Sequence, residues 1–297
     1  MRTNEVIEGL RGAGYLATKE IAYAVGGMLV QNIPLLVEGD PGCGKTCLAE
    51  AVAKMMHAKL LRVQFYEGLD YQSLIYSFDY ERQLLAIEAM RGALDRELAG
   101  KSLPEAMEIA AKISFRSRDF LIARPVLQAL EAKERCVLLL DEVDKSSEEV
   151  EYILLQVLGE YAVTIPEIGT IACPEERRPL IFLTSNRYRE LSDATKRRCS
   201  YLYIRRKTAE EMKEILMLDG SIPEKAAAWA AQCLERMQNL ALKREPSVPE
   251  AKAWIRELLS REDPDSEAGL YLLAKTPEDA KKIRASGILR QMPEVGA

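Results

Sequence analysis

The sequence predicts an α/β protein with a parallel sheet, followed by a smaller all-helical region. Three observations support this prediction. Short apolar runs alternate with longer amphipathic stretches over the first two thirds of the chain, which is typical of β-α-β units. A glycine-rich segment, GDPGCGKT at Gly39–Thr46, lies where one apolar run passes into an amphipathic stretch. Behind residue 207 the apolar runs stop and helix-start signals replace them.

The composition is that of a globular protein with a sizeable core. The chain has 297 residues, of which 48% are hydrophobic and 29% charged, and this excludes a disordered or collagen-like chain. No apolar run approaches the roughly 20 residues of a membrane span. The first residues also lack the apolar stretch of a secretory signal. We therefore expect a cytoplasmic protein without a membrane partner.

Charge and cysteine content narrow the expected partners further. The net charge of −5 argues against a polyanion as the main partner, so nucleic acid is not expected. The six cysteines form no CxxC pair, and His57 is the only histidine. A zinc site needs closely spaced ligands of these types, so none is expected. Free thiols in a reducing compartment are the simplest interpretation.

Five apolar runs predict the strands of the sheet. Each run is short and largely uninterrupted, as expected for strands that are buried on both faces. The runs are Ile33–Glu38, Leu60–Phe65, Cys136–Leu140, Leu180–Ser185 and Tyr201–Ile204. The helix that follows the glycine-rich segment is expected from about Lys45 to His57.

Helix-start signals predict only helices behind residue 207. Capping-box spacing, or an N-cap residue followed by proline, marks four starts. These starts are Thr208 with Glu211, Ser221 with Glu224, Ser247 with Glu250, and Thr276 with Pro277. We therefore expect an α/β domain over residues 1–207 and a small all-helical domain over residues 208–297.

The glycine-rich segment fits GxxxxGK[ST], the pattern of a phosphate-binding loop. Glycines allow successive backbone N–H groups to point at phosphate oxygens, and the next helix presents its positive end to them. Lys45 is expected to reach the β- and γ-phosphates, and the Thr46 hydroxyl to bind Mg²⁺. The candidate ATP-binding residues are Gly39, Asp40, Pro41, Gly42, Cys43, Gly44, Lys45, Thr46 and Cys47.

Two further strands end in polar residues that suit hydrolysis. In a parallel sheet, ligands bind at the carboxyl ends of the strands, so Asp141 and Glu142 are expected to face the phosphate loop. Asp141 is suited to holding Mg²⁺ through water, and Glu142 to polarising the attacking water. Asn186, at the end of the next strand, is expected to orient that water or contact the γ-phosphate. An ordinary solvated turn is the alternative at both places.

A basic cluster, Lys196 to Arg198, precedes the last predicted strand. It is either a solvated corner or the source of an arginine finger that reaches the nucleotide of an adjacent subunit. An arginine there would meet the charge that develops on the transferred phosphoryl group. Arg197 and Arg198 are therefore candidate catalytic residues.

The phosphate loop, the acidic strand end, the polar strand end and the basic cluster follow one another in this order. With these four elements, the sequence resembles the AAA+ ATPases. It is most similar to the MoxR family and, within it, to the branch typified by CoxD of carbon monoxide dehydrogenase maturation. The resemblance covers about residues 10–260. Its most specific segments are Gln64–Ile87, Phe120–Leu130, Val163–Pro174 and Thr184–Ile204.

The resemblance implies a P-loop NTPase core whose five parallel strands have the order 5-1-4-3-2, with a helical lid behind it. It also implies a homo-oligomeric ring, usually a hexamer, with ATP bound between subunits and Arg198 favoured over Arg197 as the finger. Residues Val163–Ala172 resemble a hairpin that often contacts the client at the pore. The stretch after the second strand resembles a family insertion.

One position departs from the family pattern. MoxR relatives often carry an arginine, called sensor 2, at the start of the third lid helix, where it contacts the γ-phosphate. This chain has Pro249 or Glu250 at that place, and the basic residues around it are Arg244 and Lys252. The resemblance therefore predicts that the sensor-2 role is absent or displaced.

The sequence thus predicts an ATPase of the MoxR type that uses ATP and Mg²⁺ to remodel a protein client. The resemblance implies a partner with a von Willebrand factor A domain and a client such as a molybdenum-containing dehydrogenase. A nucleic-acid motor or loader is a second hypothesis, favoured by the basic stretch from Arg177 to Lys207. A small-molecule P-loop kinase is a third, although it would need neither the Asn186 strand nor a lid. A nucleotide-gated scaffold with little turnover is a fourth.

Overall fold

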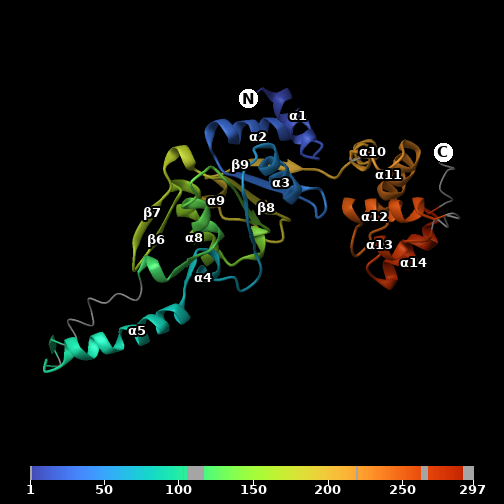
Figure 1. The fold of residues 1–297 in the computed structure, drawn as a ribbon. Coiled ribbons are helices and arrows are strands. Elements are labelled where there is room, and N and C mark those ends of the chain that lie inside the picture. The colour runs from blue at the N-terminus through green and yellow to red at the C-terminus, as the bar shows by residue number, and fades with distance from the viewer. Residues whose placement is uncertain (1, 103, 106–116, 219, 262–266, 290–297) are drawn as a thin grey trace.

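The computed structural model of the protein describes residues 2–102, 104–105, 117–218, 220–261 and 267–289. Its centre is a five-stranded parallel sheet with the strand order β2-β5-β8-β1-β9 (Figure 1). The strands are β1 (Leu35–Gly39), β2 (Leu60–Gln64), β5 (Val137–Asp141), β8 (Leu180–Ser185) and β9 (Ser200–Ile204). Numbered among themselves along the chain, these five strands have the order 5-1-4-3-2 from the β9 edge. The predicted fold class and sheet order are confirmed.

The predicted strand bounds differ little from the observed ones. Strand β8 has the predicted bounds, β2 and β9 differ by one residue at one end, and β5 is shifted by one residue at both ends. Strand β1 starts two residues later than predicted, at Leu35. Two residues that precede Leu35 explain the later start. Asn32 adopts the left-handed conformation that ends the preceding helix, and Pro34 has no N–H to donate to a neighbouring strand.

Helices cover both faces of the sheet, because alternate strand residues point to opposite faces. On one face, α1 (Thr3–Gly12), α2 (Lys19–Gln31) and α3 (Lys45–Met55) share a core with Val37, Leu139 and Phe182. On the other face, α7 (Pro125–Leu130) and α8 (Glu148–Glu160) pack on Leu36, Leu138 and Leu183. The helix predicted at residues 45–57 ends at Met55, and α1 and α2 were not predicted.

The chain makes an excursion between β2 and β5, as the resemblance implied. It contains α4 (Tyr71–Leu74), β3 (Tyr76–Phe78), α5 (Tyr80–Leu98), a 3₁₀ turn at Arg118–Phe120 and β4 (Leu121–Ala123). Strands β3 and β4 form an antiparallel pair that was not predicted. Helix α5 projects away from the sheet, and none of its described side chains is buried (Figure 1).

A second antiparallel pair precedes β8, which confirms the expected hairpin. It consists of β6 (Ala162–Ile165) and β7 (Gly169–Ala172). Two 3₁₀ turns, Val143–Lys145 and Glu175–Arg177, and the short helix α9 (Asp193–Lys196) complete this part of the chain.

All regular elements described beyond residue 207 are helices with a core of their own. They are α10 (Ala209–Met217), α11 (Glu224–Gln238), α12 (Val248–Leu259), α13 (Leu270–Leu273) and α14 (Pro277–Ser286). The core of this helical region draws its buried residues from positions 212 to 288 and includes the fully buried Trp254. Residues 219, 262–266 and 290–297 of the predicted lid lie outside the described residues.

Three of the four predicted helix starts are confirmed. Thr208 and Ser247 head capping boxes, and the Thr276 hydroxyl accepts a hydrogen bond from the backbone of Asp279. The predicted capping box at Ser221 is wrong. Pro223 occupies the N-cap of α11, and the Ser221 hydroxyl instead accepts hydrogen bonds from Arg256.

Within the described residues, no helix has both the length and the apolar character of a membrane span.

Candidate nucleotide-binding site

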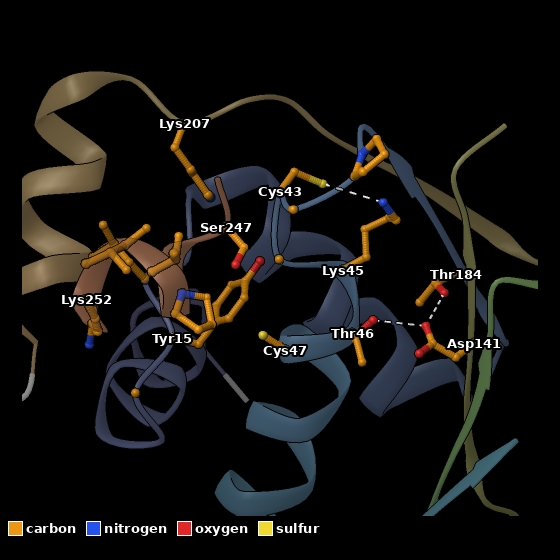
Figure 2. A pocket seen from close by; sticks show the side chains of 18 of the residues that line it. Tyr15, Cys43, Lys45, Thr46, Cys47, Asp141, Thr184, Lys207, Ser247 and Lys252 are labelled. Carbon is orange, nitrogen blue, oxygen red and sulfur yellow. Dashed lines mark hydrogen bonds between the residues drawn. The ribbon is translucent and has the colours of Figure 1, made fainter. Parts of the chain in front are cut away.

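A cavity of about 600 Å³ lies where β1, β5 and β8 end, at the carboxyl edge of the sheet. Its walls come from the phosphate loop, the ends of β5 and β8, the loop before α2 and the start of α12 (Figure 2). Cavities of this size hold small molecules such as nucleotides. The site therefore lies where a parallel sheet is expected to bind its ligand.

The phosphate loop has the backbone that the sequence predicts. Gly42 and Gly44 adopt φ values of +81° and +98°, a region that side chains other than glycine rarely reach. Gly39 is required by close approach, because a Cβ atom there would lie 2.3 Å from the carbonyl oxygen of Ile204. Lys45 is buried, and its Nζ donates hydrogen bonds to the carbonyls of Gly39, at 2.8 Å, and Asp40, at 2.9 Å. The ammonium group is thus held at the loop where phosphates would bind.

Thr46 and Asp141, the predicted metal-holding pair, are in direct contact. The Thr46 hydroxyl donates to Asp141 Oδ1 at 2.9 Å, and the Thr184 hydroxyl donates to the same oxygen at 2.5 Å (Figure 2). A hydroxyl and a carboxylate are oxygen ligands that suit Mg²⁺. Among the described residues no cluster of three acidic, His or Cys ligands occurs. A metal at Thr46 and Asp141 would therefore take its other ligands from phosphate and water.

Glu142 and Asn186 also meet at this edge of the sheet. The Asn186 amide Nδ2 donates to Glu142 Oε1 at 3.0 Å, while Gln64 Nε2 and Lys145 Nζ each donate to Oε2 at 2.7 Å. The hydrogen bond to Glu142 raises the pKa of Lys145. Gln64 and Lys145 were not predicted, because neither belongs to a motif. The pairing of β2 with β5, which puts Gln64 opposite Asp141, is the signal that would have found Gln64.

Asp144 fixes the loop that carries Asn186, and the sequence did not single it out. Its side chain is 1% exposed, and Oδ2 accepts the backbone N–H groups of Asn186, at 3.0 Å, and Tyr188, at 2.8 Å. The residue between them, Arg187, has a φ of +61°. Asp144 thereby stabilises an unusual backbone beside the candidate catalytic residues.

Part of the cavity lining comes from residues outside any motif. Tyr15 is buried beside Gly44, where an added Cβ would lie 3.5 Å from the tyrosine ring. The Lys207 ammonium lies 5.9 Å from the centre of this ring. Burial raises the pKa of Tyr15 and lowers the pKa of Lys207. The apolar residues Leu16, Ile215 and Val248 also line the cavity.

The two cysteines of the loop have different exposures but similar chemistry. Cys43 is buried and its Sγ lies 3.9 Å from Lys45 Nζ, whereas Cys47 is exposed within the cavity wall. Burial raises the pKa of both thiols above the ordinary value. Both side chains are therefore uncharged at neutral pH.

The start of α12 forms the wall opposite the phosphate loop. Pro249, at the predicted sensor-2 place, lines the cavity together with Lys252 and Arg256. Arg244 does not line it, and its backbone N–H donates to Asp279 instead. Of the two basic residues named from the sequence, only Lys252 therefore faces the cavity.

The two candidate finger arginines do not line the cavity of their own chain. Arg198 Nη1 donates to the Ala194 carbonyl at 2.9 Å, and its side chain packs on Gly159. Arg197 is exposed, and no side-chain partner for it occurs in the described part of the chain. An arginine from this cluster can therefore reach a phosphate site only in another copy of the chain or after a rearrangement.

The chain is similar to known proteins both in sequence and in fold. The sequence model of a family described as AAA domain (dynein-related subfamily) matches residues 34–199, which is more than half of the chain. No curated protein matches. The RuvB Holliday junction branch migration motor of Thermotoga maritima is 17% identical, with a TM-score of 0.44, and the match covers 90% of this chain and 67% of that chain. A mutant of the same protein is 16% identical, with a TM-score of 0.46 and coverages of 90% and 68%.

Proposed function

Because this chain belongs to the AAA domain family (dynein-related subfamily), we propose that it is a MoxR-type chaperone that remodels a protein client by hydrolysing ATP. The chain is an ATPase with the α/β P-loop fold, and its cofactors are ATP and Mg²⁺. The observation that supports the site best is the meeting of Glu142 with Asn186 beside the contact of Thr46 with Asp141. All four residues line the cavity that contains the phosphate loop.

Binding is assigned to the loop and the metal-holding pair. Lys45 and the loop Gly39–Cys47 hold the triphosphate, aided by the positive end of α3. Thr46 and Asp141 would hold Mg²⁺, which would supply positive charge to neutralise the phosphates. Tyr15, which lines the cavity beside Gly44, contacts the bound nucleotide.

Catalysis is assigned to Glu142 and Asn186. Glu142 accepts a proton from the attacking water, whose oxygen forms a bond to the γ-phosphorus as the bond to the β–γ bridging oxygen breaks. The products are ADP and inorganic phosphate. Asn186 keeps Glu142 in position through the 3.0 Å hydrogen bond between them.

The assembly that we propose is a homo-oligomeric ring, hexameric as in MoxR relatives. Arg198, with Arg197 as the alternative, then supplies the finger to the site of the adjacent copy. This arrangement is supported by the observation that neither arginine lines the cavity of its own chain. We further propose two domains, an AAA+ domain over residues 1–207 and a helical lid over residues 208–297, because the helical region has a separate core.

For the client we propose a protein, with a molybdenum-containing dehydrogenase as the example and a von Willebrand factor A domain protein as the partner. Helix α5, which projects from the sheet, and strand β7, the more exposed strand of the β6–β7 hairpin, are the candidate contact elements. Five of the ten basic residues in the stretch Arg177–Lys207 form ion pairs with acidic side chains, which weakens the nucleic-acid hypothesis. Its ion pairs join Arg187 and Arg206 to Asp40, Arg189 to Glu151, Lys196 to Glu190, and Arg205 to Glu211.

We propose a cytoplasmic location because all six cysteines, which lie in the described residues, are free thiols.

The substitution Glu142→Gln tests this proposal. We expect the variant to bind Mg·ATP as the wild type does, to lose hydrolysis, and to remain in an ATP-locked oligomer detectable by mass photometry. Capture of proteins on this locked form should then identify the client. Lys45→Ala is the companion variant, and it should lose nucleotide binding itself. Unimpaired turnover in Glu142→Gln, stimulation of turnover by DNA, or phosphate transfer to a metabolite would contradict the proposal.

A further inference from the structure

Arg62 on β2 belongs to no motif and does not line the cavity, yet its guanidinium contacts the carboxylate of Asp141. Asp141 is 2% exposed, and both of its oxygens are engaged. Oδ1 accepts the hydroxyls of Thr46 and Thr184, and Oδ2 accepts from Arg62 Nη2. The contact follows from the sheet, because β2 pairs with β5 and brings Arg62 and Asp141 to neighbouring positions.

We propose that Arg62 is the counter-ion of Asp141 in the metal-free protein and that it competes with Mg²⁺ for this carboxylate. The proposal rests on the proposed function, because it takes Asp141 as a metal-holding residue. A buried carboxylate needs a cation or a full set of hydrogen bonds. A guanidinium group keeps its charge at any pH the protein meets. Mg²⁺ would neutralise the same carboxylate with two charges, and an arginine that remained beside it would repel it.

Arg62 is able to leave Asp141 without being buried elsewhere. Its side chain is 45% exposed, whereas that of Asp141 is 3% exposed. Strand β2 is also an edge strand of the sheet. The guanidinium can therefore move into water when a metal arrives, and its departure leaves no charge in an apolar environment.

The same nitrogen of Arg62 connects the metal-holding carboxylate to the proposed general base. Arg62 Nη2 donates to Gln64 Oε1 at 2.9 Å, and Gln64 Nε2 donates to Glu142 Oε2 at 2.7 Å. A continuous series of contacts thus runs from Asp141 through Arg62 and Gln64 to Glu142. Displacement of Arg62 by the metal removes one of the contacts that fix Gln64. Arg62 is therefore a positioning residue that links metal binding to the orientation of Glu142.

Calorimetry with a non-hydrolysable ATP analogue tests this role. Each protein is titrated once with Mg²⁺ present and once in EDTA, and the ratio of the two affinities is the gain from Mg²⁺. We expect Arg62→Gln to increase this gain on the order of tenfold, with the affinity in EDTA unchanged. Arg62→Lys, which keeps the charge, should stay close to the wild type. Melting of the nucleotide-free protein should occur at a lower temperature in Arg62→Gln, because Asp141 has lost its counter-ion.

Arg118→Gln is the matched control. The Arg118 side chain is 43% exposed, close to the 45% of Arg62, and pairs with Glu131, which is 28% exposed. Neither Arg118 nor Glu131 lines the cavity. The gain in affinity from Mg²⁺ in Arg118→Gln should equal that of the wild type. An unchanged or smaller gain in folded Arg62→Gln overturns the proposal. If that variant does not fold, Arg62→Met keeps the aliphatic stem and is judged by the same criterion. A wild type that binds the analogue in neither buffer would instead contradict the proposed function.

Discussion

The phenol of Tyr15 is buried beside the phosphate loop, but no hydrogen-bond partner for its hydroxyl occurs among the described residues. An unsatisfied buried polar group costs about 1–3 kcal/mol. In the nucleotide-free protein this hydroxyl is therefore a cost, and it becomes useful only when a ligand offers it a hydrogen bond. Stability and binding should respond to its removal with opposite signs.

We predict that Tyr15→Phe increases the free energy of unfolding of the nucleotide-free protein by about 1 kcal/mol and weakens nucleotide binding about tenfold. Urea denaturation measures the first effect and calorimetry with Mg·ADP the second. Tyr23→Phe, at a tyrosine that is 62% exposed, is the control and should change neither quantity. A less stable variant with unaltered affinity would show that Tyr15 only fills space.

At the same scale, the motif residues were predictable and their supporting residues were not. Lys45, Thr46, Asp141, Glu142 and Asn186 belong to local patterns whose spacing has a chemical reason, and the structure places all of them on one cavity. Their partners come from other parts of the chain and follow no pattern. Gln64, Asp144 and Arg62 reach the site only through strand pairing or loop contacts, which one sequence does not display.

Among the elements, α8 and α9 are joined through the carboxylate of Glu151. Its Oε1 accepts the Ser192 backbone N–H at 2.7 Å and the Ser192 hydroxyl at 2.5 Å, and its Oε2 accepts from Arg189 at 2.9 Å. Burial alone would raise the pKa of Glu151. The hydrogen bonds from Ser192, Thr195 and Arg189 oppose burial, and the resulting pKa lies below the ordinary value. The charged form of Glu151 therefore stabilises the segment that leads to Arg197 and Arg198.

We predict that Glu151→Gln lowers the free energy of unfolding by about 2 kcal/mol at pH 7. A carboxyl with a lowered folded pKa stabilises the protein fully above its unfolded pKa, about 4.3 for Glu. This contribution is lost as pH falls through the folded value. The difference between variant and wild type should therefore shrink below about pH 4, as urea denaturation at several pH values can measure. Glu148→Gln, at an exposed position of the same helix, should cost only a few tenths of a kcal/mol. A cost for Glu151→Gln that does not depend on pH would show that shape rather than charge matters there.

Long, strongly patterned elements were predicted more accurately than short or weakly patterned ones. All five strands of the central sheet were found because strands buried on both faces are continuous apolar runs. Strands β3 and β4 have three residues each, which is too short for a pattern to emerge. The prediction of a capping box at Ser221 was wrong because Pro223 occupies the N-cap position, so the helix begins two residues later. Local spacing cannot reveal which of two adjacent cap signals the folded chain uses.

At the scale of the whole molecule, the cavity joins the sheet to the helical region. Arg206 Nε contacts Asp40 of the phosphate loop at 3.0 Å, and its Nη2 contacts Glu245, just before α12, at 2.9 Å. Lys252 and Arg256 of α12 line the cavity from the other side. A nucleotide bound there would contact both parts, so its binding and release would change how the helical region is held. The sequence predicted the change of architecture near residue 207 but not this bridge, whose members are far apart in the chain.

Whether one copy completes the site of another can be tested by mixing two inactive proteins. Lys45→Ala has an intact basic cluster but no phosphate-binding lysine, and a protein with Arg197→Ala and Arg198→Ala has the reverse. We expect each alone to lose turnover about a thousandfold or more. In an equimolar mixed ring, about a quarter of the interfaces pair an intact loop with an intact arginine. Turnover should therefore recover to about a quarter of the wild-type value in a coupled assay of ADP release.

The matched control mixes Lys45→Ala with Glu142→Gln, because both of these defects lie in the same cavity. No interface in that mixture has a complete site, so its turnover should stay at the background level. Exchange of fluorescently labelled subunits must show in both mixtures that the copies assemble together. Recovery in the first mixture and none in the control would place the arginines in the neighbour's site. If the first mixture exchanges subunits but stays inactive, both arginines act within their own chain, and the ring would no longer be required for hydrolysis.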